Sequence, residues 1–131
     1  MSRWILGAGA ACGFLAVALG AFGAHGLRGA GLSARSLELW DTAVDYQMAH
    51  ALAVLLAAAL AGRGIAARAA ARAAGLCLAG IAVFSGSLYL LALTGTRWLG
   101  AVTPLGGVCF LAGWVILTAS ALAPGTPARD A

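Results

Sequence analysis

The chain has 131 residues, of which 63% are hydrophobic and only 9% are charged. In a soluble domain about a quarter of the residues are charged, so this composition excludes an ordinary soluble protein and predicts apolar surface that faces lipid. The net charge of +4 comes from eight basic residues, all of them Arg. Because these arginines flank apolar stretches, membrane topology and contact with anionic lipid account for them without nucleic acid as a partner.

The first long apolar stretch, residues 4–24, contains 21 residues and no charge. As an α-helix it would extend about 31 Å, which matches the hydrocarbon core of a bilayer. A signal peptide is the competing interpretation, but its apolar region spans only about 7 to 15 residues. We therefore expect a transmembrane helix here.

The polar connection after this stretch leads into a second apolar segment. Ser33 is suited to cap a short interfacial helix that includes Trp40, and a second span is expected over 42–61. The first turns of this span carry polar side chains, so they must face protein or water rather than lipid.

Two further apolar segments follow an arginine-rich connection. They predict spans over 74–93 and 104–123, with Pro104 in the first turn of the last one, where its missing N–H costs nothing. The polar tail 124–131 would be ordered only if something holds it. We predict an all-α fold: a single transmembrane domain, 1–131, of four helices in up-down order, with the short interfacial helix before the second span.

Four spans place both termini on one side of the membrane. That side has five arginines and the other has three, accompanied by three carboxylates. The positive-inside rule favours cytoplasmic termini in a bacterial inner membrane. The residues are Arg3, Arg63, Arg68, Arg72 and Arg129 on the first side, and Arg28, Arg35 and Arg97 with Glu38, Asp41 and Asp45 on the second.

Small residues recur on one face of the first and fourth spans. Such stripes allow helix backbones to approach closely in lipid, where no hydrophobic force drives helices together. The spacing leaves open whether the contact is within the chain or with a neighbour. The glycines are Gly9, Gly13, Gly20, Gly106 and Gly113.

Polar side chains of all four spans are expected near one leaflet. On the second helix, Tyr46, Gln47 and His50 share an arc of about 100° that would point into the bundle, whereas Asp45 lies on another face and could pair with Arg28 or Arg97. The candidate cluster is His25, Asp45, Tyr46, Gln47, His50, Tyr89, Arg97 and Thr103.

Three interpretations of this cluster stay open. It could ligate a metal or haem, although two histidines 25 residues apart lack tight ligand spacing. It could form a pocket for a quinone or another small molecule, because ionisable residues inside a membrane indicate a site. Alternatively, the side chains satisfy one another and lock the helices together. We favour this last interpretation and predict no metal and no cofactor.

No nucleophile and base stand at a readable spacing, and no glycine-rich phosphate loop follows a strand. The three cysteines lie in apolar runs, where Cys behaves as a small hydrophobe. The sequence therefore predicts a protein that is not an enzyme.

Four motifs resemble one family of small bacterial membrane proteins. They are GAFGAHGL at 20–27, WDTAVDYQMAH at 40–50, GSLYLLALTGTRWLG at 86–100, and TPLGG at 103–107 followed by GW at 113–114. Together they resemble the YgdD-like family, whose animal relatives are called transmembrane protein 256. The resemblance implies a four-span inner-membrane protein and brings no established activity.

For function, these features favour a non-catalytic accessory or scaffolding protein. We expect it to dock through its small-residue faces onto a membrane-protein partner, or to form a homo-oligomer within the lipid bilayer. The alternative is a protein that binds or transports a lipid, a quinone or a proton-linked solute in the outer-side cluster.

Overall fold

The computed structural model describes residues 3–123, and every regular element in that part of the chain is helical. Four helical stretches are long and apolar enough to cross a membrane, which confirms the predicted all-α fold with four spans. Two of them contain one π-helical turn each. The elements are α1 (Arg3–Phe22), η1 (Gly23–Leu27), α2 (Ala34–Leu60), α3 (Ala67–Gly80), η2 (Ile81–Ser85), α4 (Gly86–Thr94) and α5 (Leu99–Leu122).

The start of the second span differs from the prediction. The expected interfacial helix is not separate, because α2 runs without a break from Ala34. Its cap is the predicted one: the Ser33 hydroxyl oxygen accepts a hydrogen bond from the Ser36 N–H at 3.1 Å. With Trp40 buried by tertiary contacts, nothing in this stretch favours a break between the interfacial turns and the span.

Pro104 also lies elsewhere than predicted. Helix α5 begins at Leu99, so the proline falls inside the helix instead of in its first turn. A proline there removes one backbone hydrogen bond near the helix start. The predicted polar tail, including Arg129, lies outside the described residues.

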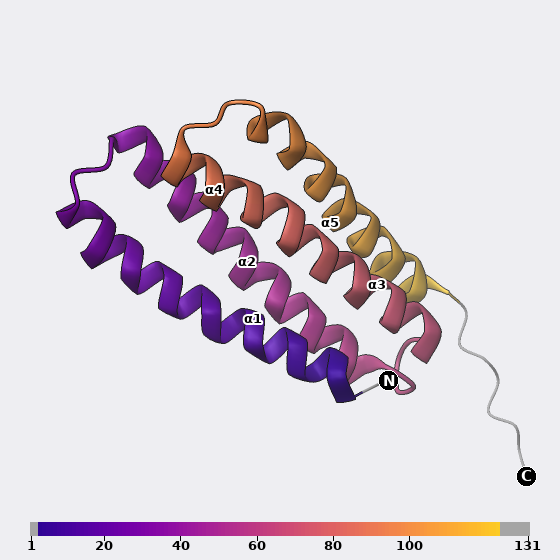
Figure 1. Cartoon of the computed structure of the whole chain (residues 1–131). Coiled ribbons are helices and arrows are strands. Elements are labelled where there is room, and N and C mark those ends of the chain that lie inside the picture. Colours follow the sequence, from indigo (N-terminus) through magenta and orange to yellow (C-terminus); the bar gives the residue numbers. More distant parts are fainter. Residues whose placement is uncertain (1–2, 124–131) are drawn as a thin grey trace, which may run out of the picture.

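The helices form a bundle in which α2 and α3 occupy the centre (Figure 1). Helix α1 packs chiefly on α2, and α5 packs chiefly on α3, so α1 and α5 lie on opposite sides of the central pair. Helix α4 continues α3 through η2 and also packs on α2. The α1 start and the α5 end lie at the same end of the bundle, as up-down order requires.

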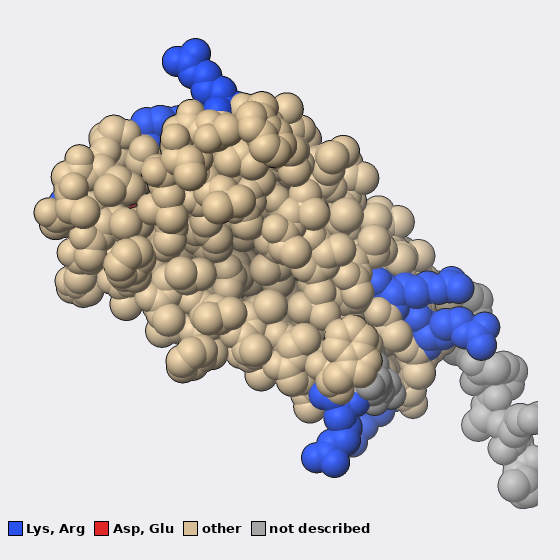
Figure 2. Space-filling view, viewed as in Figure 1, with Lys and Arg blue, Asp and Glu red and all other residues tan. Residues whose placement is uncertain are grey.

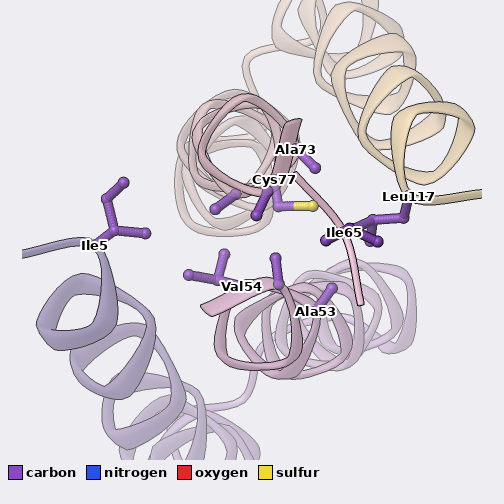
Figure 3. Packing of buried hydrophobic residues seen from close by; sticks show 10 residues of the cluster. Ile5, Ala53, Val54, Ile65, Ala73, Cys77 and Leu117 are labelled. Carbon is purple, nitrogen blue, oxygen red and sulfur yellow. The ribbon is translucent and has the colours of Figure 1, made fainter. Parts of the chain in front are cut away.

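The largest apolar cluster fills the half of the bundle nearest those two helix ends (Figure 3). Val54 of α2 and Cys77 of α3 are almost completely buried at its centre, and Leu117 of α5 and Ile5 of α1 close it on either side. Many of the remaining members are alanines, which bring the helix backbones close together. Packing here depends on small side chains rather than on large hydrophobes.

The predicted packing glycines face neighbours within the same chain. A Cβ added to Gly9 would lie 2.7 Å from Val54 Cγ1, one on Gly113 would lie 3.1 Å from Cys77 Sγ, and one on Gly106 would overlap the backbone of Phe84. The approach is looser at Gly13 and Gly20, whose nearest neighbours are also in α2. These faces are occupied internally, which corrects the expectation that the protein docks on a partner through them.

Arginine side chains gather at the two ends of the bundle, and the face in Figure 2 shows none between them. The charge-free band corresponds to the four apolar helices. The end at which α1 begins carries Arg3, Arg63, Arg68 and Arg72. The described acidic residues all belong to the opposite end.

Candidate functional site: the polar network between the helices

Gln47 lies at the centre of the network. It is 4% exposed, on the face of α2 between α1 and α4. Its Nε2 donates to the carbonyl of Cys12 at 2.9 Å, and its Oε1 accepts from the Tyr89 hydroxyl at 2.8 Å. One amide side chain thereby joins three helices, and both ends of that amide are satisfied.

His50, one turn further along α2, is buried and uses both ring nitrogens. Nε2 lies 3.1 Å from the indole Nε1 of Trp114, which can only donate, and Nδ1 lies 2.8 Å from the carbonyl of Tyr46, which can only accept. These partners require a neutral ring with its proton on Nδ1. The ring also stacks on Phe110 with centroids 3.5 Å apart. His50 therefore joins α2 to α5 by two interactions, the hydrogen bond with Trp114 and the stacking on Phe110.

Small hydroxyls make the remaining links between α2, the third span and α5. Ser85, in the π-helical turn η2, is fully buried and donates to the carbonyl of Ala43 at 2.8 Å. Ser87 and Thr103 share a hydrogen bond of 2.7 Å. These bonds hold the third span against both α2 and α5.

Trp40 fastens α1 to α2 near the end of the first span. Its indole Nε1 donates to the carbonyl of Leu19 at 2.8 Å, and its ring packs against Tyr89 with centroids 4.6 Å apart. The approach depends on Gly23, since a Cβ there would lie 2.6 Å from Trp40 Cδ1. The indole of Trp40 therefore packs directly against the start of η1, the π-helical turn that begins at this glycine.

The network is closed. Among residues 3–123, every buried side-chain nitrogen and oxygen has a hydrogen-bond partner. In the same part of the chain no group of three His, Cys, Asp or Glu side chains converges as a metal site would need. The three cysteines are free thiols. The arrangement can hold helices together, and it offers no unoccupied ligand set in its interior.

Three residues of the predicted cluster lie outside this network. His25, Asp45 and Arg97 are exposed at the end of the bundle opposite the termini. Arg28 faces Asp41 at 4.0 Å instead of Asp45, because Asp45 occurs one turn further into the helix. The structure therefore brings together Gln47 with Tyr89, Tyr46 with His50, and Ser87 with Thr103, and leaves the charged members of the cluster at the surface.

Sequence reasoning did not find several members of the network. Trp114 and Phe110 lie in an apolar run that carries no polar signal, and Trp40 was assigned to the membrane interface. Ser85 and Ser87 are not members of the predicted cluster. Their partners are backbone carbonyls or residues on other helices, which no spacing within one helix reveals.

Comparison with known proteins identifies the family of this chain. A family described as "Protein of unknown function (DUF423)" matches residues 19–107. The chain belongs to this family. The DUF423 match includes Gln47, His50, Tyr89 and Thr103, so most of the network lies inside the shared region. The sequence resemblance to a family of small membrane proteins of unknown function is thereby confirmed.

Relatives of the DUF423 chain are named membrane proteins in several bacteria. The UPF0382 membrane protein YwdK of Bacillus subtilis is 46% identical over 114 residues, which cover 87% of this chain and 92% of the relative. A UPF0382 membrane protein of Haemophilus influenzae is 46% identical over 105 residues, or 80% and 82% of the two chains. No solved structure matches the chain. These likenesses establish a membrane protein and leave its activity to be argued from the site.

Proposed function

We propose that this DUF423 protein is a non-catalytic membrane component that associates through its lipid-facing surface with a membrane-protein partner or a second copy. The observation that carries the proposal is the closed network: every buried polar side-chain atom among residues 3–123 is engaged within the chain. A catalytic site needs an acid, base or nucleophile that is free to act. His50, the strongest candidate, has both nitrogens engaged.

The surface available for association lies on the outer helices. Helix α1 is the least buried of the four spans and exposes large side chains, among them Phe14. Helix α5 exposes a similar face, which includes Val115. Since the packing glycines are already used inside the bundle, a partner would contact these larger side chains.

Site-specific photo-crosslinking in native membranes tests this proposal. A benzophenone side chain at Phe14 or at Val115 is expected to give a light-dependent protein adduct of one defined mass from one of the two faces. Mass spectrometry of the complex purified in mild detergent then gives its stoichiometry. Recovery of the free monomer alone, with no protein adduct from either face, would contradict the proposal.

A second candidate function rests on Tyr46. Its side chain is 44% exposed on α2 between Phe84 and Phe110, and no hydrogen bond within the described part of the chain engages its hydroxyl. A small lipid-soluble molecule with an acceptor oxygen, such as a quinone, would satisfy that hydroxyl. A melting shift caused by a short-chain quinone and lost in Tyr46→Phe would favour this function, whereas no shift would favour the first.

We further propose cytoplasmic termini in a bacterial cell membrane. Arg3, Arg63, Arg68 and Arg72 lie at the end where α1 begins, which carries no acidic residue within 3–123. The other end mixes arginines with carboxylates, and positive charge is retained in the cytoplasm. A fluorescent protein fused to the C-terminus should fluoresce, and an alkaline phosphatase fused there should be inactive. The reverse pattern would invert the orientation.

A further inference from the structure

A cleft opens between α1 and α2 at the arginine-rich end of the bundle. It has a volume of about 380 Å³ and is open to the outside on one side. Two arginines, Arg3 and Arg63, line it together with the apolar residues Leu6, Leu55, Ala58 and Ala59. The site therefore combines two cations with an apolar wall formed by two transmembrane helices.

The cleft extends from the interface into the apolar part of the bundle. Leu55 precedes the end of α2 at Leu60 by five residues, which corresponds to about 8 Å along the helix axis. A ligand that occupies the whole cleft needs a charged group at the interface and a hydrocarbon part beneath it. A membrane lipid has this shape.

The charge of the site requires an anion. Neither Arg3 nor Arg63 forms an ion pair with a carboxylate inside the described ranges, where the only salt bridges are Arg28–Asp41 and Arg35–Glu38 at the other end. Guanidinium groups bind phosphate oxygens through charge-assisted hydrogen bonds. Basic pockets between transmembrane helices bind acidic lipid head groups for this reason.

We propose that this cleft is a binding site for an anionic phospholipid, with the phosphate between Arg3 and Arg63 and an acyl chain along Leu6 and Leu55. Such a lipid would be held at the junction of α1 and α2, the helix on which α1 chiefly packs. This site is independent of the polar network in the other half of the bundle.

Native mass spectrometry of the full-length protein in detergent tests the site. Phosphatidylglycerol and phosphatidylcholine with identical acyl chains serve as probes. We expect phosphatidylglycerol to bind about twenty-five-fold more tightly than phosphatidylcholine, because each of the two arginines near an acidic head group contributes roughly a factor of five. Equal binding of the two lipids would overturn the proposal.

Paired variants separate the cleft from general electrostatics. R3Q/R63Q should lower phosphatidylglycerol binding to the phosphatidylcholine level. The matched control R68Q/R72Q removes the same charge at the same end, outside the cleft, and should keep the preference. Equal losses in the two double variants would show attraction by the whole basic end and refute a site.

One more variant and one competitor test the apolar half of the site. Ala59→Phe fills the cleft without changing charge and should abolish phosphatidylglycerol binding, while melting in lipid-free detergent shows that the fold is intact. Inorganic phosphate should not displace the lipid, and displacement would identify a phosphate site instead. A dimer lost in R3Q/R63Q would assign the cleft to a second copy and would likewise overturn the proposal.

Discussion

Replacing Gln47 with Met tests whether the polar network holds the helices together. Met has a similar volume and lacks both hydrogen-bonding groups, so the change removes the bonds to Cys12 and Tyr89 without opening a cavity. Side-chain hydrogen bonds between helices in membranes contribute about 0.6 kcal/mol each, and the Tyr89 hydroxyl left without an acceptor costs about 1 kcal/mol more. We expect a loss of about 2 kcal/mol in the free energy of unfolding.

A double-mutant cycle isolates the interaction between the two side chains. Tyr89→Phe alone should cost about 1 kcal/mol, and the double variant should cost no more than Gln47→Met alone, because no hydroxyl is then left unpaired. Reversible unfolding in detergent and dodecyl sulfate mixtures, followed by tryptophan fluorescence, measures the free energy of unfolding of the two single variants and the double variant. Tyr46→Phe is the control and should change stability by less than about 0.5 kcal/mol. Additive costs of the two single variants, within about 0.3 kcal/mol, would refute the reasoning.

The same unfolding assay checks three further predictions. Gly106→Ala should destabilise by about 3 kcal/mol or more because its Cβ would overlap the backbone of the third span; its neighbour Gly107→Ala, with 3.9 Å to the nearest atom, should be neutral or slightly stabilising, and equal effects would contradict the packing described. Ser33→Ala should cost about 1 kcal/mol through the lost cap of α2, and no cost would mean that the helix starts elsewhere. Asp41→Asn should change stability by less than about 1 kcal/mol, since its 4.0 Å pair with Arg28 is exposed to water; a larger loss would assign this pair a structural role.

The features of single helices could be predicted from the sequence. Hydropathy located the four spans. The helical periodicity of α2 put Tyr46, Gln47 and His50 on one inward arc; Gln47 and His50 are buried, but the prediction was wrong for Tyr46, which is exposed. The cap at Ser33 followed from its hydroxyl and its place before a helical pattern. Each of these depends on neighbours within one element.

The features that depend on two helices could not be predicted in the same way. The bond between Tyr89 and Gln47 needs the relative rotation of α2 and α4. That rotation depends on the π-helical turn η2, because a π-helical turn contains more residues than an α-helical one and so reduces the rotation per residue of the third span. Nothing in the sequence IAVFS marks such a turn. Trp114 was missed because an indole in an apolar run gives no sign that its N–H faces His50.

The protonation state of His50 tests the closed network most directly. In ¹⁵N-histidine-labelled protein in nanodiscs, the exposed His25 serves as the internal reference. The structure predicts a neutral imidazole with its proton on Nδ1 and an unprotonated Nε2 that accepts from Trp114, and Trp114→Phe should shift the Nε2 resonance. A proton on Nε2, or a spectrum unchanged by Trp114→Phe, would contradict the account.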